Sequence, residues 1–275
     1  MPDARTAGVN PLKRLIHQTL LSAGWDLRRV GNFREPNLAD FLHCQAIDLV
    51  LDVGANEGQF AMALREAGYA GEIVSFEPIS FVFAKLAENA ARDHHWTARR
   101  QALADHVGGA KIEVTARTVY SSMKPQAALR RNSQDPDTAV ISTEAIEVTT
   151  LDHIFPEFAG RKVFLKMDTQ GFEQQILMGA ARSLPEVGAV QLELPVVHYY
   201  ERVWPLTEAI GFMARAGFVI AQVRPVHYIP GTASVAELDC VFQRQEPSGV
   251  KSQITPDALA SSVREPHHGK ADASA

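Results

Sequence analysis

The strongest constraint on the fold is a regular alternation of short apolar runs with amphipathic stretches in the middle of the chain. The stretch after the first run repeats apolar residues at helical spacing, as in Phe60, Leu64 and Ala67. Such alternation predicts parallel strands joined by helices on both faces of one sheet. The predicted parallel strands are Ile47–Val53, Glu72–Phe76, Ala98–Ala104, Val163–Met167 and Ala189–Leu194.

The pattern changes after the last of these strands. Two more strand-like runs, Phe218–Val223 and Leu238–Gln243, are joined by a segment that has no room for a long helix. They predict an antiparallel hairpin at the end of an otherwise parallel sheet. Residues 117–143 form a long polar segment, and a loop of that length inside a domain is usually a lid or a binding loop.

The two ends of the chain differ in composition from the middle. We expect residues 1–46 to be a helical extension, residues 47–244 to be the folded domain and residues 245–275 to be a disordered tail. Residues 11–30 place apolar side chains at helical spacing beside several basic ones. This pattern favours a helix that caps the domain, and peripheral contact with a membrane or a partner surface is the alternative.

Composition excludes several classes of function. The formal net charge of −5 over 275 residues argues against a nucleic-acid-binding protein. The sequence has no apolar run approaching the ~18–20 residues of a transmembrane helix. The N-terminus lacks the clean apolar stretch of a signal peptide, so we expect a cytoplasmic protein. No oligomeric state is predicted.

The ends of the first two strands carry a candidate cofactor site. The first strand runs into a glycine turn from Gly54 to Gly58, which a helical pattern follows at once. Glycine lets a ligand approach the backbone, and a helix N-terminus presents unpaired N–H groups. The second strand ends at Glu77, near the ~20-residue offset expected for an acid that accepts hydrogen bonds from a ribose diol.

Each of these signals alone could be structural: the glycine turn could be a tight connection and Glu77 a solvated side chain. Together, at the ends of consecutive strands, they indicate a nucleoside cofactor. The spacing Gly54-Ala-Asn-Glu-Gly58 is not the Gly-x-Gly-x-x-Gly of pyrophosphate binders. It suits a cofactor without pyrophosphate, such as S-adenosylmethionine.

At these residues the chain resembles the FkbM family of methyltransferases. The resemblance covers residues 48–243 and is most specific in Lys166-Met-Asp168-Thr-Gln170-Gly171-Phe-Glu173, where the family has Lys-x-Asp-x-x-Gly-x-Glu. Thr169-Gln170 departs mildly from the pattern, in which an apolar residue and an acid are commoner. The resemblance implies a Rossmann-like class I methyltransferase fold and transfer of a methyl group to oxygen, commonly on sugars, glycolipids or secreted small molecules.

The expected site combines these motifs. The residues expected to bind the cofactor are Asp52, Gly54, Asn56, Gly58, Glu77 and Ala104. Asp168 is the first candidate for the general base that an alcohol acceptor needs, with Glu193 and His198 as further catalytic candidates. For each of these three, a structural role is the alternative. Asp168, Glu193 and a histidine could form a magnesium site, but no clustered ligand set singles one out, so no metal is expected.

Two other functions compete with an O-methyltransferase that acts on a small-molecule or glycan acceptor. An NAD-dependent oxidoreductase would normally continue the strand–helix pattern where this chain predicts a hairpin, and it would carry Gly-x-Gly-x-x-Gly. A module that binds a nucleoside or a partner without catalysis would have no need for Asp168 or the polar segment 117–143. We therefore favour the methyltransferase.

Overall fold

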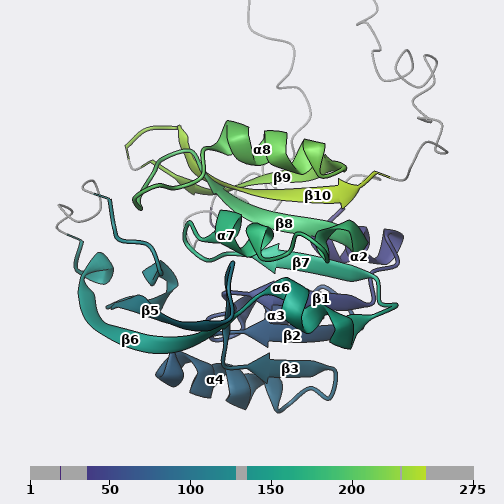
Figure 1. The fold of residues 1–275 in the computed structure, drawn as a ribbon. Coiled ribbons are helices and arrows are strands. Elements are labelled where there is room, and N and C mark those ends of the chain that lie inside the picture. The colour runs from purple at the N-terminus through teal and green to yellow at the C-terminus, as the bar shows by residue number, and fades with distance from the viewer. Residues whose placement is uncertain (1–18, 20–35, 128–134, 230, 246–275) are drawn as a thin grey trace, which may run out of the picture.

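A seven-stranded sheet forms the centre of the structure (Figure 1). The computed structural model describes residues 36–127, 135–229 and 231–245, together with Thr19. The strand order is β3-β2-β1-β7-β8-β10-β9. The strands are β1 (Leu49–Val53), β2 (Glu72–Phe76), β3 (Trp96–Arg99), β7 (Val163–Met167), β8 (Val187–Pro195), β9 (Phe218–Tyr228) and β10 (Val235–Arg244).

The register confirms the predicted topology. Strands β3, β2, β1, β7 and β8 pair in parallel, whereas β10 pairs antiparallel with both β8 and β9. Every residue of β1 and of β7 is buried, as expected for central parallel strands covered on both faces. The chain order reverses between β1 and β7, which is where doubly wound sheets bind ligands at the carboxyl ends of their strands.

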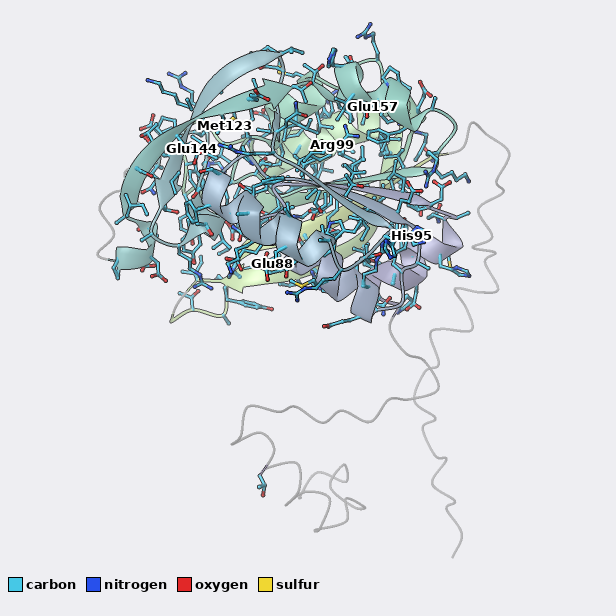
Figure 2. The ribbon with its side chains drawn as sticks, turned by 90° about the horizontal axis from the view of Figure 1, so that it is seen from below. Glu88, His95, Arg99, Met123, Glu144 and Glu157 are labelled. Carbon is cyan, nitrogen blue, oxygen red and sulfur yellow. The ribbon has the colours of Figure 1, made fainter. Side chains whose placement is uncertain are left out.

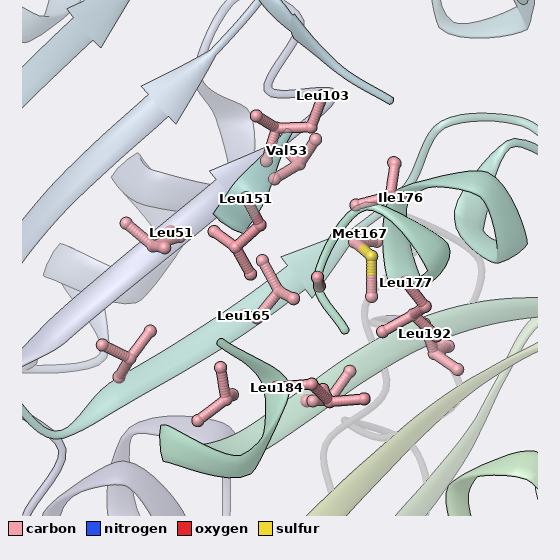
Figure 3. Packing of buried hydrophobic residues seen from close by; sticks show 14 of the residues in the cluster. Leu51, Val53, Leu103, Leu151, Leu165, Met167, Ile176, Leu177, Leu184 and Leu192 are labelled. Atoms are coloured by element: carbon pink, nitrogen blue, oxygen red, sulfur yellow. The ribbon is translucent and has the colours of Figure 1, made fainter. Parts of the chain in front are cut away.

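Helices cover both faces of this sheet, as predicted. Helices α2, α3 and α4 pack on one face with Val50 and Phe164, and α6, α7 and α8 pack on the other with Leu51 and Leu165. The core on the face covered by α6, α7 and α8 is shown in part in Figure 3. It joins β1, β7 and β8 to α6 and α7 through interdigitated aliphatic side chains. The helices are α2 (Leu38–Cys44), α3 (Gln59–Glu66), α4 (Ser80–Ala90), α6 (Leu151–Ile154), α7 (Glu173–Met178) and α8 (Leu206–Arg215); the 3-10 helices are η1 (Thr118–Tyr120), η2 (Pro136–Thr138), η3 (Phe155–Phe158) and η4 (Leu184–Glu186).

A second, three-stranded sheet lies beside the carboxyl ends of the main strands, and the sequence did not predict it. It has the order β4-β6-β5 and consists of β4 (Ala102–Leu103), β5 (Gly108–Thr115) and β6 (Val140–Thr149). The prediction of one strand over Ala98–Ala104 was therefore wrong. Residues 96–99 pair with β2, whereas 102–103 pair with β6, because Ala102 packs in a separate apolar core with Ile112 and Val148.

The same sheet corrects the prediction of a long polar loop over 117–143. Residues 118–120 and 136–138 form 3-10 helices, and 140–143 already belong to β6, which pairs with β5. Glu144 of β6, labelled in Figure 2, accepts a hydrogen bond from the backbone N–H of Ser80 at 3.1 Å and one from Arg100 at 2.9 Å. The small sheet is thereby fixed to the start of α4.

The predictions for both ends of the chain fall largely outside the described residues. The amphipathic segment 11–30 is described only at Thr19, and the tail 245–275 only at Gln245. Over the part of the chain that the structure describes, helices are too short or too polar to span a bilayer.

Candidate active site

The glycine turn after β1 packs against the turn after β7. Gly54 has φ +75°, and a Cβ at this position would lie 2.0 Å from the backbone oxygen of Asp168. Only glycine allows this close approach, because the clash is with backbone that cannot move aside. Gly58, at φ +94°, begins α3, and an added Cβ there would meet the ring of Trp96 at 2.5 Å. Gly58 therefore serves packing, whereas Gly54 brings two strand ends together.

Glu77 connects this turn to the end of β2. Its carboxylate is 5% exposed and accepts the backbone N–H of Asn56 at 3.0 Å on one oxygen and that of Ile79 at 2.9 Å on the other. Burial raises the pKa of Glu77 to about 7, although both N–H groups act to lower it. Each oxygen keeps lone-pair capacity for a further donor.

A cavity of about 630 Å³, partly open to solvent, lies over these strand ends. Glu77 and Asn56 supply polar groups from the first two strands, Asp168 and Gln170 supply them from β7, and the walls between are largely apolar. The remaining lining includes Val53, Gly54, Phe76, Ile79, Leu103, Ile112, Thr118, Ser122 and Met123.

Residues after β5 form the outer wall of this cavity. The Asn56 side-chain amide donates to the Thr118 hydroxyl at 3.0 Å, and the Ser122 hydroxyl donates to the backbone oxygen of Gln170 at 2.9 Å. The first residues of the polar segment 117–143 therefore line the cavity, and its role as a binding loop stays a prediction.

A buried ion pair lies beneath the cavity. Lys166 Nζ is 3.1 Å from a carboxylate oxygen of Asp52 and 3.6 Å from one of Asp168. Asp52 is fully buried and also accepts a hydrogen bond from Ser75 at 3.1 Å. Burial lowers the pKa of Lys166, but the two carboxylates outweigh it and raise this pKa above its ordinary value. Asp52 does not line the cavity, and in the structure it serves as the ion-pair partner of Lys166.

Asp168 is the candidate base that faces the cavity. Its side chain is 39% exposed, and it adjoins a second, smaller cavity of about 260 Å³ through Gln170, which lines both. Glu193 and Glu237 line the second cavity. Burial, followed by the negative charges of Asp168 and Glu237, raises the pKa of Glu193 well above its ordinary value.

Besides Asp52 and Gly58, two further predicted site residues lie outside the lining of both cavities. Ala104 is fully buried and does not line the cavity, because its backbone packs against Gly179, where a Cβ would lie 2.0 Å from the Ala104 oxygen. Its neighbours Ala102 and Leu103 line the cavity instead. His198 is exposed and lines neither cavity, because the chain turns the neighbouring Tyr199 and Tyr200 toward the smaller one.

Sequence reasoning also missed a residue of the site. Gln170 was noted only as a departure from the family pattern, yet its amide contacts both Asp168 and Glu193. Its φ of +56° is unusual for a residue other than glycine, and no sequence signal apart from the adjacent Gly171 pointed to it. Glu173, in contrast, lies on the helix and accepts the backbone N–H groups of Thr169 and Gly171.

One group of metal-binding residue types gathers within the described residues. The ligand atoms of Glu193, His227 and Glu237 lie within 4.8 Å of one another. His227 is already paired with Glu237 at 2.8 Å, and Glu193 with Gln170 at 2.9 Å. These contacts account for all three side chains, so we assign no metal to them.

The described site fits S-adenosylmethionine. Ribose hydroxyls need an acceptor such as Glu77, and an adenosine needs apolar walls of the kind that Phe76, Ile79 and Leu103 supply. Among the described residues of its lining, the cavity has no array of basic side chains for a pyrophosphate, since the charged ones, Glu77 and Asp168, are both acids.

Comparison with known proteins agrees with this fit. Residues 52–220 match the model of the methyltransferase FkbM domain. A methyltransferase FkbM from Methylobacillus flagellatus KT is 16% identical, with a TM-score of 0.45 over 70% of this chain and 43% of that one. The chain thus spans less than half of that protein.

Other solved structures are more distant in sequence. Magnesium protoporphyrin IX methyltransferase (ChlM) from Synechocystis PCC 6803 is 12% identical, with a TM-score of 0.40 over 87% of this chain and all of that one. A TehB-like SAM-dependent methyltransferase from Corynebacterium glutamicum ATCC 13032 Kitasato is 11% identical, with a TM-score of 0.36 over 86% of this chain and all of that one. The comparison with curated proteins found no match.

The family match covers more than half of the chain and includes the glycine turn, Glu77 and Asp168. It places the chain among methyltransferases and not among the NAD-dependent oxidoreductases that the sequence left as an alternative. The chain belongs to the FkbM family of S-adenosylmethionine-dependent methyltransferases.

Proposed function

We propose that this methyltransferase acts on a hydroxyl oxygen of a sugar, glycolipid or secondary metabolite, with Asp168 as the general base. The observation that carries the proposal is a carboxylate at the carboxyl end of β7 that lines the cofactor cavity and remains partly exposed. An alcohol is a poor nucleophile while protonated, and a carboxylate within hydrogen-bond reach can take its proton.

The residues around the cavity have different roles in binding and in proton transfer. Glu77 accepts hydrogen bonds from the ribose, and the turn at Gly54 brings the backbone close to the ligand. When bound, S-adenosylmethionine supplies an electrophilic methyl group on a positively charged sulfur. Asp168 takes the proton of the acceptor hydroxyl as the new oxygen–carbon bond forms and the carbon–sulfur bond breaks. Lys166, 3.6 Å away, places a positive charge beside the Asp168 carboxylate.

Positioning supplies much of the rate. Holding donor and acceptor in line can contribute ~7–11 kcal/mol to lowering the barrier. Beside Asp168, the lining of the larger cavity also carries the polar side chains of Asn56 and Gln170. These groups suit an acceptor with several hydroxyl groups, as a polyhydroxy compound has.

The test is label transfer from methyl-labelled S-adenosylmethionine to fractionated lipids, glycans and small metabolites. We expect a labelled product whose methyl group survives alkaline hydrolysis, as an ether does and an ester does not. Asp168→Asn should keep the affinity for S-adenosylmethionine within about threefold and lose at least about 100-fold in turnover.

The matched control is Asp48→Asn. Asp48 precedes β1 at the opposite end of the sheet, where its side chain pairs with Arg161. We expect this variant to turn over normally. Normal turnover in Asp168→Asn would assign Asp168 a structural role. Binding of S-adenosylmethionine without label transfer to any fraction would favour a module that binds without catalysis.

A further inference from the structure

Gln170 occupies the boundary between the two cavities. The family pattern more often has an acid here, and this chain has an amide. The backbone of Gln170 is held in the left-handed region at φ +56°, and its carbonyl oxygen accepts the hydroxyl of Ser122 at 2.9 Å. Both the backbone and the side chain are therefore fixed from outside the turn.

The side-chain amide of Gln170 has one N–H for each of two carboxyl groups. Nε2 lies 3.2 Å from Asp168 Oδ1 and 2.9 Å from Glu193 Oε2. The hydroxyl of Tyr200 lies 3.0 Å from Oε1, which orients the amide with its nitrogen toward the acids. A primary amide has two N–H bonds, so this arrangement uses both. A carboxylate at position 170 would instead place a third negative group against the pair.

The charges around this pair favour a single proton on Glu193. Burial comes first, and the carboxylates of Asp168, Glu237 and Glu173 follow, in raising the pKa of Glu193. Among the cations, Lys166 lies 3.6 Å from Asp168. His227, from β9, faces Glu237 at 2.8 Å. When two acids interact this strongly, one ionises readily and the other keeps its proton.

We propose that Gln170 is a positioning residue that holds Asp168 and Glu193 as one carboxyl pair, and that the charge of this pair distinguishes the sulfonium donor from the neutral thioether product. The proposal rests on the proposed function, in which the sulfur end of the cofactor faces Asp168. It assigns a role to Gln170, one of the two residues after β7 that depart from the family pattern.

The consequence is a pH-dependent preference between two ligands. S-adenosylmethionine carries a positive sulfur and S-adenosylhomocysteine a neutral one. As the pH rises, the pair loses its proton and gains one negative charge, which favours the sulfonium. Glu77, with a pKa of about 7, also titrates in this series, but it serves the ribose, which both ligands share. Its effect therefore cancels in the ratio of the two dissociation constants.

The experiment is calorimetric titration of the full-length protein with each ligand between about pH 5 and about pH 9. We expect the preference for S-adenosylmethionine over S-adenosylhomocysteine to increase about fivefold through one transition. In Gln170→Leu the midpoint should move upward by about one pH unit, because two hydrogen bonds that stabilise the ionised pair are lost. In Glu193→Gln the transition should disappear.

Two further variants complete the design. Tyr200→Phe removes the hydroxyl that orients the amide and keeps the ring, so it should move the midpoint upward by a smaller amount and remains informative if Gln170→Leu does not fold. Gln222→Leu makes the same chemical change on β9, in a groove lined by β9, β10 and the start of α2. It should leave the midpoint unchanged.

Three results would overturn the proposal. They are a ratio that stays flat with pH in the unmodified protein, a midpoint that does not move in Gln170→Leu and Tyr200→Phe, and a transition that survives in Glu193→Gln. The last result would assign the titration to a group outside the carboxyl pair. Failure of both ligands to bind the unmodified protein would instead contradict the cofactor site itself.

Discussion

Replacing Glu77 with glutamine tests the cofactor site most directly. The carboxylate is 5% exposed, and each of its oxygens already accepts one backbone N–H, from Asn56 and from Ile79. Glutamine keeps the shape and one oxygen, but it sets an NH₂ group against the other backbone N–H. The substitution removes the negative charge without creating a cavity.

The size of the effect follows from the loss of a charged acceptor. A hydrogen bond to an ionised group contributes ~1.5–3 kcal/mol, so S-adenosylmethionine should bind about ten- to a hundredfold more weakly to Glu77→Gln. The affinity of the unmodified protein should rise as the pH increases through about 7, the pKa of Glu77, because only the ionised carboxylate accepts from both ribose hydroxyls on free lone pairs. Glu77→Gln should lack this rise.

Stability changes with pH in the opposite direction. The folded pKa of about 7 lies above the ordinary 4.5, so the folded state binds this proton more tightly than the unfolded state does. Stability should therefore fall between about pH 4.5 and about pH 7 and level off above it. The loss attributable to this group is about 3 kcal/mol. In Glu77→Gln this component of the pH dependence should be absent.

Calorimetry with S-adenosylmethionine and urea unfolding, both followed from about pH 5 to about pH 8.5, measure these two effects on the same samples. The reasoning predicts that affinity rises while stability falls. An unchanged affinity in a folded Glu77→Gln variant would refute the assignment of Glu77 to the ribose. A rise in affinity with pH that persists in the variant would assign the titration to another residue.

Three further predictions concern the glycine turn, the buried ion pair and the need for a metal. Gly54→Ala should lower the free energy of unfolding by several kcal/mol, since its Cβ would lie 2.0 Å from the backbone oxygen of Asp168 at φ +75°; urea unfolding within about 0.5 kcal/mol of the unmodified protein would contradict this. Lys166→Met should lower the free energy of unfolding by about 3–5 kcal/mol, because it leaves the carboxylate of Asp52 buried without its cation. Adding Asp52→Asn should recover part of that loss in the same assay. Removing divalent metals with EDTA should leave the calorimetric affinity for S-adenosylmethionine unchanged, since Glu77 and Asp168 are the only residues of metal-binding type in the described lining of the larger cavity; a tenfold loss would show that a metal takes part.

For the family motif at the end of β7, the sequence pattern predicted the local structure, and only the tertiary structure showed which side chains pair. The pattern Lys-x-Asp-x-x-Gly-x-Glu predicted a strand end and a turn, and the structure shows Lys166 in contact with both Asp52 and Asp168, the latter of which lines the cavity. Residues two apart in a strand point to the same face, which accounts for the contact with Asp168, but Asp52 comes from the neighbouring strand β1. The pattern therefore could not say that Lys166 would pair with Asp52.

The small sheet was beyond prediction for a different reason. Its strands β5 and β6 pair across a connection of more than 20 residues, and the run over Ala98–Ala104 reads as one apolar strand. Two pieces of that run belong to two sheets, and local propensity does not distinguish them, because burial against Ile112 and Val148 decides the second piece.

The sequence by itself determined the parallel core, the closing hairpin and the residues at the first two strand ends, because apolar periodicity and glycine placement are local properties that survive in any tertiary context. Only the tertiary structure decided which polar groups meet. Gln170 and Glu193 are 23 residues apart and lie in different elements, yet they are 2.9 Å from each other. Contacts of this kind depend on how strands from distant parts of the chain align at one sheet edge, and that alignment is fixed by the packing of the whole core.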